Sequence, residues 1–164
     1  MDSRERSAIE WECAHNTVKF YRRLDEARGE EAATLFAEDG IWYREGDDGG
    51  YTGRAEIAGH VNRVRQRGDQ SIPQDERVII HQVINVEVTV MDENTAEVRA
   101  HTVIIHGRRG KSPAEPGEMR GVTAVYPTVE IHKRTPEGWR IASKRTSRLL
   151  KVPDQAGARQ PQPA

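Results

Sequence analysis

The stretch RVIIHQVINVEVTVMDENTAEVRAHTVIIHGRR, residues 77–109, decides the fold class. Val, Ile and Thr dominate both of its halves, and such β-branched residues favour strands. The polar tetrapeptide MDEN separates the halves, which predicts an antiparallel hairpin with strands over Val78–Val90 and Thr95–His106. His81 and His106 sit inside these strands, one near each outer end of the hairpin. An imidazole on each arm of an otherwise aliphatic hairpin needs an explanation.

Side chains alternate across a strand, so each arm of the hairpin has two faces. In the second strand His106 falls on the apolar face, whereas His101 falls on the face with the charged residues. In the first strand His81 and Asn85 share a face with aliphatic residues, but beyond Asn85 the aliphatic residues have the opposite parity. We therefore expect a β-bulge or a sharp bend near Asn85.

Helical patterns precede the hairpin and further strand patterns follow it. The first helical segment carries a broad apolar stripe that ends with Asp25. In chain order the expected elements are helices over 7–27 and 28–40, a short strand over 41–45, a turn and helix over 50–68, the hairpin, and strands over 120–134 and 138–150. Helices followed by an antiparallel sheet form the α+β pattern. We expect one domain over residues 1–150 and a disordered tail over 151–164, which lacks periodicity.

Length and composition exclude several classes of protein. The chain has 164 residues and a formal net charge of −1 with both signs interspersed, which fits one globular domain without a nucleic-acid partner. Cys13 is the only cysteine, which excludes an intrachain disulfide and a thiolate metal cluster. No apolar run approaches the ~20 residues of a membrane helix, and the first residues lack an apolar signal core. We expect a cytoplasmic protein that does not bind membranes.

Five polar residues fall on faces that should point into the protein: Asp25, Tyr43, His81, His106 and Arg145. Each of them alone is readily explained as a structural residue, for example by an ion pair between Asp25 and Arg145. Burying several ionisable groups costs several kcal/mol unless they pair or line a cavity. The five together therefore indicate a pocket with reactive groups.

Arg145 enters this set through the alternation of the last strand. Trp139, Ile141, Ser143 and Arg145 have one parity, which the two apolar residues assign to the inside. Lys144 has the other parity, and we expect it to point outward.

Four stretches carry a resemblance to a known family: LDEARGEEAATLFAEDGIWYREG, YTGRAEIAGHV, IIHQVINVEV and EGWRIASKR, which span most of residues 8–148. They resemble the SnoaL-like branch of the nuclear transport factor 2-like superfamily. The resemblance implies a cone-shaped α+β fold in which three N-terminal helices pack on a strongly curved, mostly antiparallel sheet. That fold hosts isomerases, dehydratases, cyclases, hydrolases and non-catalytic subunits, so it does not name one activity.

The site residues are most similar to those of scytalone dehydratase, with hexachlorocyclohexane dehydrochlorinase and bile-acid dehydratase beside it. The resemblance implies an Asp at the end of the first helix and a His at the start of the long strand, which are Asp25 and His81 here. His106 and Tyr43 stand where the dehydratase has a second His and a strand tyrosine, and we expect all four residues to be catalytic. Arg145 matches an arginine in the closing segment of the dehydrochlorinase.

The expected substrate-binding residues are Arg145, Asn85, Trp42 and Tyr126. We expect His81 to act as a general base and Asp25 to orient its ring. His106 and Tyr43 would donate to a carbonyl oxygen or protonate a leaving hydroxyl. The chemistry is proton abstraction beside a carbonyl, followed by loss of water or migration of a double bond, in a small hydrophobic or polyketide-like molecule. It needs no cofactor and no metal.

Two alternatives stay open. His81, His106 and Asp25 have the composition of a two-His, one-carboxylate metal site, although no close ligand pair such as HxH or HExxH occurs. The second alternative is a non-catalytic protein, either a ligand-binding module or a structural subunit like the small subunit of ring-hydroxylating dioxygenases. Val103 and Ile105 on the outward face of the hairpin also predict a homo-oligomer, either a dimer or a trimer.

Overall fold

Helices dominate the first part of the chain and strands the rest, as the sequence predicts. The computed structural model describes residues 1–45, 49–67, 70–112 and 114–151. Its helical elements are α1 (Ser3–Asp25), α2 (Gly29–Ala33), α3 (Gly53–Asn62) and a 3₁₀ turn, η1 (Val64–Arg67). Apart from Lys151, the tail predicted to be disordered lies outside the described residues. Within the described residues, no helix is both long and apolar enough to cross a bilayer.

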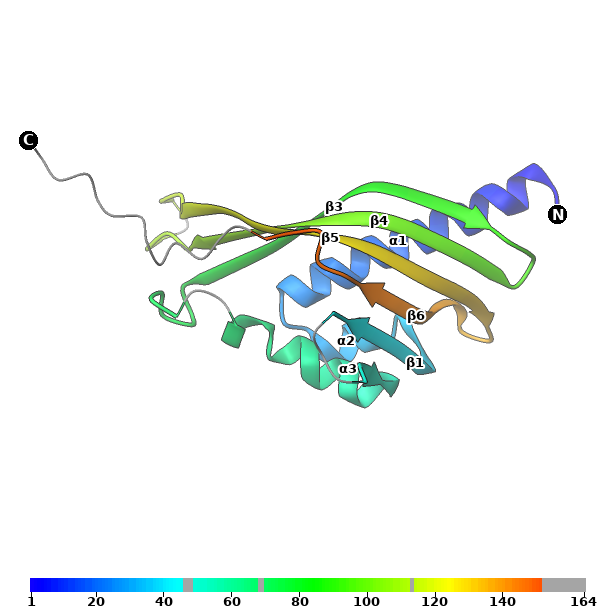
Figure 1. Ribbon diagram of the computed structural model, residues 1–164, viewed down its shortest axis with the longest axis horizontal. Helices are drawn as coiled ribbons and strands as arrows, with labels where there is room; N and C mark the ends of the chain where they lie inside the picture. Colours follow the sequence, from blue (N-terminus) through cyan, green and yellow to red (C-terminus); the bar gives the residue numbers. More distant parts are fainter. Residues whose placement is uncertain (46–48, 68–69, 113, 152–164) are drawn as a thin grey trace, which may run out of the picture.

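One curved sheet contains the strands. They are β1 (Phe36–Arg44), β2 (Tyr51–Thr52), β3 (Arg77–Val90), β4 (Thr95–Arg108), β5 (Glu118–Thr135), β6 (Gly138–Thr146) and β7 (Leu150–Lys151). Their spatial order is β2-β1-β6-β5-β4-β3, with β7 paired to β5 outside this path. β1 and β6 run parallel, whereas the other pairs are antiparallel. Figure 1 shows α1 lying along the curved sheet with α2 and α3 beside it. The expected α+β architecture, with N-terminal helices on a curved and mostly antiparallel sheet, is confirmed.

The bulge predicted near Asn85 is present in β3. Ile84 pairs with His101 and Glu87 pairs with Arg99, so β3 has one residue more than β4 between these two pairs. Asn85 has a φ of 53°, in the left-handed region that Asn tolerates better than most residues. The extra residue reverses the parity of the strand, which reconciles its two apolar faces.

The helix predicted over residues 28–40 is wrong in its second half. Helix α2 ends at Ala33, and Phe36 begins β1. Leu35 accepts a hydrogen bond from the Ile141 amide at 2.9 Å, and Phe36 pairs with Ile141 in β6. Tertiary pairing therefore overrides the helix propensity of this segment. The last strand likewise ends earlier than predicted, at Thr146.

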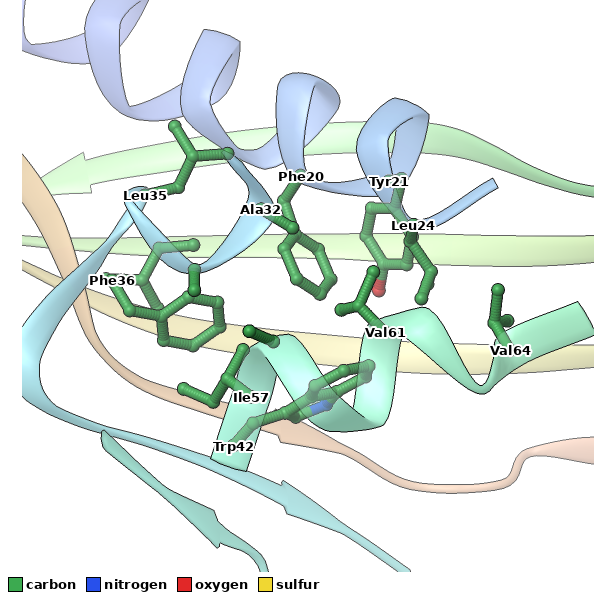
Figure 2. Packing of buried hydrophobic residues seen from close by; sticks show 13 residues of the cluster. Phe20, Tyr21, Leu24, Ala32, Leu35, Phe36, Trp42, Ile57, Val61 and Val64 are labelled. Carbon is green, nitrogen blue, oxygen red and sulfur yellow. The ribbon is translucent and has the colours of Figure 1, made fainter. Parts of the chain in front are cut away.

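Helix α1 spans the sheet and takes part in two apolar clusters. Asp2 begins it by accepting a hydrogen bond from the Glu5 amide at 2.8 Å. The cluster at its C-terminal half joins α1 to α2, α3 and β1. Figure 2 shows that cluster, in which the Phe20 ring meets Phe36 and Trp42 edge-on with ring centroids 5.4 and 5.1 Å apart. The second cluster joins the N-terminal half of α1 to β3, β4 and β6. These contacts fix the angle at which the end of α1 approaches the sheet.

A buried group of polar residues lies between the two clusters. Glu130 and His132 on β5, Lys144 on β6 and Thr17 on α1 are all fully buried. Glu130 accepts hydrogen bonds from Thr17 Oγ1 at 2.7 Å and from Lys144 Nζ, and its Oε2 lies 2.8 Å from His132 Nε2. The charges of Glu130 and Lys144 thus have hydrogen-bond partners inside the protein, which offsets the cost of removing these charges from water.

The prediction that Arg145 points inward and Lys144 outward is wrong. Lys144 is fully buried and Arg145 is exposed. Ile131 pairs with Ser143 and His132 pairs with Ile141, so Ala142 is the extra residue of a bulge in β6. The bulge reverses the alternation between Ile141 and Lys144, and a count of parity along the sequence does not detect it.

Candidate active site

Asp25 and His81 form a close pair where α1 meets β3. Oδ1 of Asp25 lies 2.5 Å from Nδ1 of His81, and Oδ2 accepts the backbone N–H of His81 at 3.0 Å. The exposed fractions of the two side chains are 19% for Asp25 and 10% for His81. A carboxylate on Nδ1 favours the tautomer with the proton on that nitrogen, which leaves the lone pair on Nε2.

The fold explains why the pair forms. Asp25 is the last residue of α1, and β3 is an edge strand of the sheet. An edge strand presents backbone N–H groups that no neighbouring strand can accept. One carboxylate oxygen of Asp25 accepts a hydrogen bond from the backbone N–H of His81, and the other contacts the imidazole ring of the same residue. Both oxygens therefore hold His81. The ring of Tyr21, one turn earlier on α1, stacks on the imidazole with centroids 5.6 Å apart and an interplanar angle of 28°.

A cavity of about 280 Å³ opens beside His81, between the helices and the inner face of the sheet. Its apolar lining includes Leu24, Val64, Ile79, Ile104 and Ala124. Its polar lining consists of Tyr21, Trp42, Arg44, Glu45, His60, His81, Thr102, His106, Thr123, Tyr126, Thr146 and Arg148. A cavity of this size that combines aliphatic and aromatic side chains with several polar groups has the general character of a small-molecule site.

Four of the eight residues predicted for the site line this cavity: Trp42, His81, His106 and Tyr126. Asp25 does not line it but holds His81 from behind, and both residues border a shallow groove on the outer side. The imidazole of His81 therefore stands between the outer groove and the inner cavity.

The other three predicted residues lie away from the cavity. Tyr43 is 37% exposed, and the guanidinium of Arg145 lies over its ring at 5.5 Å from the centroid. Tyr43 and Arg145 are also paired across β1 and β6, so they occupy the face of these strands away from Trp42 and Lys144. Asn85 is exposed at the bulge of β3. The structure does not bring these three side chains to His81.

His60 is a cavity residue that the sequence interpretation missed. Its side chain is 3% exposed and packs against the rings of Trp42 and Tyr51, with centroids 4.8 and 3.9 Å away. Its Nε2 lies 3.2 Å from Nη1 of Arg44. His60 follows Ile57 by three residues, so both lie on the apolar face of α3. This spacing could have identified His60 from the sequence.

The buried ion pair lies next to the stacked tyrosine. Nζ of Lys144 is 4.3 Å from the ring centroid of Tyr21, whose hydroxyl lies 2.9 Å from Oγ1 of Thr128. Burial alone would raise the pKa of Glu130, but Lys144 and His132 outweigh it and lower that pKa to about 2. Burial would lower the pKa of Lys144, but the Glu130 carboxylate raises it. Lys144 therefore carries a positive charge beside the ring of Tyr21.

The metal-site alternative requires His106 to join Asp25 and His81. In the part of the chain that the structure describes, no group of three or more His, Cys, Asp or Glu side chains is arranged to hold a metal ion. His106 lines the cavity, whereas Asp25 does not. The geometry thus favours an acid–base pair over a two-His, one-carboxylate site.

Comparison with known proteins agrees with the fold. The SnoaL-like domain family matches residues 5–145. No functionally curated protein shows a significant match. An NTF2-like protein with a cystatin-like fold from Novosphingobium aromaticivorans is 21% identical, with a TM-score of 0.69, and the match covers 89% of this chain and 85% of that one.

Two further solved structures have names that suggest an activity. A candidate scytalone dehydratase from the same species is 17% identical, with a TM-score of 0.59 and coverage of 84% of this chain and 82% of that one. A ketosteroid isomerase-like protein from Erwinia carotovora atroseptica is 15% identical, with a TM-score of 0.55 and coverage of 83% and 92%. At these identities the likeness shows the fold and not the reaction.

Proposed function

The chain belongs to the SnoaL-like domain family, and from this premise we propose that it is a cofactor-independent lyase or isomerase. Its substrate would be a small hydrophobic carbonyl or polyketide-like compound. The observation that carries the proposal is the Asp25–His81 pair, with a 2.5 Å contact between carboxylate and imidazole, at the wall of a cavity between the helices and the sheet.

The first step is removal of a proton from the carbon beside the carbonyl group. His81 takes this proton on Nε2, and Asp25 stabilises the imidazolium that forms. The electron pair left on carbon moves onto the carbonyl oxygen as an enolate. An apolar lining strengthens the attraction between this charge and nearby donors, because little water competes.

The second step decides between the two reaction types. If the enolate carries a hydroxyl on the neighbouring carbon, protonation of that hydroxyl releases water and leaves a double bond. If it is conjugated with a double bond, protonation at the far carbon completes an isomerisation. His106 lines the same cavity as His81 and is the candidate acid for either step. Trp42 and Tyr126 would hold the apolar body of the substrate.

Conversion of 3-cyclohexen-1-one to its conjugated isomer tests this proposal, because it requires only removal of one proton beside the carbonyl and return of a proton at the far carbon of the double bond. The conjugated product is followed by its ultraviolet absorbance. His81→Ala should lower kcat by ~10²–10⁴-fold, the usual effect of losing a general base. Asp25→Asn should lower kcat less, because the imidazole keeps a neighbour but loses its charge partner.

His101→Ala serves as the matched control. His101 is also on the β3–β4 hairpin but lies on the other face of β4, away from the cavity. Equal activity of the wild type and His81→Ala, with both proteins folded, would overturn the acid–base proposal. Binding of the ketone without conversion would favour the ligand-binding alternative instead.

We further propose that the chain forms a homo-oligomer through the sheet face that points away from the cavity. Ile80, Ile105 and Val122 are directly paired across β3, β4 and β5. Ile80 and Val122 are 46% and 47% exposed. A row of aliphatic side chains on the outer face is a surface that a second copy would cover.

A further inference from the structure

Thr102 has a buried hydroxyl that nothing in the described structure binds. The residue is 1% exposed, it lines the cavity beside His81, and its Oγ1 has no hydrogen-bond partner among the described residues. A buried hydroxyl without a hydrogen-bond partner lowers the stability of the folded state. Valine has nearly the same shape without this cost, so stability alone does not explain a threonine at this position.

The sheet register places Thr102 close to the proposed base. Thr102 pairs directly with Val83, and His81 lies two residues before Val83 on β3. His81 and Thr102 are therefore diagonal neighbours on one face of the sheet, with Cα atoms roughly 7–8 Å apart. Both side chains line the same cavity. One ligand in this cavity can therefore contact both residues.

We propose that Thr102 is a specificity-determining residue that donates its hydroxyl hydrogen to the carbonyl oxygen of the substrate. The α-carbon that loses its proton and the carbonyl oxygen are joined through a single carbon atom. A ligand that presents its α-proton to His81 thus presents its oxygen to Thr102. As the proton leaves, negative charge grows on this oxygen and the hydrogen bond strengthens.

This inference rests on the proposed function and narrows it. It requires a carbonyl or another hydrogen-bond acceptor at the centre of the ligand, and not a hydrocarbon alone. It also gives the oxygen-binding role, which the sequence assigned to Tyr43 and His106, to Thr102, since Tyr43 does not line the cavity. His106 then remains the candidate proton donor for the second step.

Binding of a matched pair of ligands tests the assignment without any turnover. The bicyclic ketone 1-tetralone and its hydrocarbon analogue tetralin have similar shapes and differ at the oxygen. Calorimetric titration of the wild type should show a preference for the ketone. Thr102→Val should weaken ketone binding by roughly 3–10-fold, the size of a hydrogen bond between neutral groups, and leave tetralin binding unchanged. Thr102→Ser keeps the hydroxyl and should retain the preference.

Two further measurements separate a ligand-binding role from a structural one. The thermal midpoint of Thr102→Val should rise by about 2–4 °C, because the unsatisfied hydroxyl is gone. Its kcat with 3-cyclohexen-1-one should fall by up to ~10²–10³-fold, as for other donors to a developing oxyanion. A lower thermal midpoint would show that the hydroxyl stabilises the fold and would overturn the proposal.

The outcomes also separate this inference from the proposed function. A wild type that shows no preference for the ketone, or a Thr102→Val variant that keeps it, overturns the role of Thr102. A wild type that prefers the ketone through Thr102 but whose kcat is insensitive to His81→Ala refutes the acid–base reaction alone.

Discussion

Replacing Lys144 by Met should destabilise the protein by about 3–5 kcal/mol, the usual cost of leaving one member of a buried ion pair without its partner. Lys144 and Glu130 are both fully buried, and Lys144 donates directly to Glu130. Methionine has a similar length and no charge, so the Glu130 carboxylate would lose its cation and keep only Thr17 and His132 as partners.

The lowered pKa of Glu130 gives a second value for how much the buried charges stabilise the fold. It falls from 4.5 to about 2 in the folded protein. At about 1.4 kcal/mol per pH unit, this depression is worth about 3 kcal/mol. Because the folded-state pKa is below the unfolded one, the contribution is fully present above pH 4.5 and is lost as the pH falls from 4.5 toward about 2.

Urea unfolding at several pH values measures both effects. The free energy of unfolding is compared for the wild type, Lys144→Met, Glu130→Gln and the double variant. The double variant should lose less than the two single variants together, since it leaves no unpaired charge. The decrease in the free energy of unfolding between pH 4.5 and about 2 should be smaller in Glu130→Gln than in the wild type. Additive losses, or an unchanged acid dependence in Glu130→Gln, would refute the assignment of a coupled charged pair.

The remaining predictions concern the bulge of β3 and the outer face of the sheet. Asn85→Ala should cost ~1–2 kcal/mol in urea unfolding, because Asn85 has a φ of 53° that alanine adopts poorly, whereas Asn85→Gly should cost much less. Light scattering at micromolar concentration should report a dimer or trimer, and Ile80→Lys should shift the population toward monomer because it places a charge within the exposed aliphatic row. A wild type that scatters as a monomer would contradict the proposed assembly.

The sequence predicts features that depend on local patterns. The β3–β4 hairpin and its bulge at Asn85 followed from alternation and from a change of parity within one strand. Helix and strand periodicity assigned Asp25 and His81 to inward faces, and the resemblance to the SnoaL-like branch then paired the two residues. Periodicity alone left Arg145 open as the partner of Asp25, so it was the resemblance that predicted this contact between residues 56 positions apart.

Features that depend on pairing between distant strands were not predictable in this way. The bulge at Ala142 becomes visible only when β6 is aligned with β5, and it exchanges the positions of Lys144 and Arg145. Lys144 was expected on the outward face, because the sequence does not show that Glu130 is its partner. Thr102 has the same parity as His106 on β4, but an unsatisfied hydroxyl is a property of the packed cavity and not of the strand.

The double role of Asp25 has a consequence for how this family diverges. One oxygen of its carboxylate holds the ring of His81, and the other accepts a backbone amide that every residue except proline would supply at this position. If a descendant lost the imidazole and with it the reaction, the aspartate would still protect the open edge of β3 from pairing with another chain. Selection against aggregation would then preserve it after selection for turnover had ceased. Retention of this aspartate in a relative is consequently weak evidence for catalysis, whereas joint retention of aspartate and histidine is strong evidence.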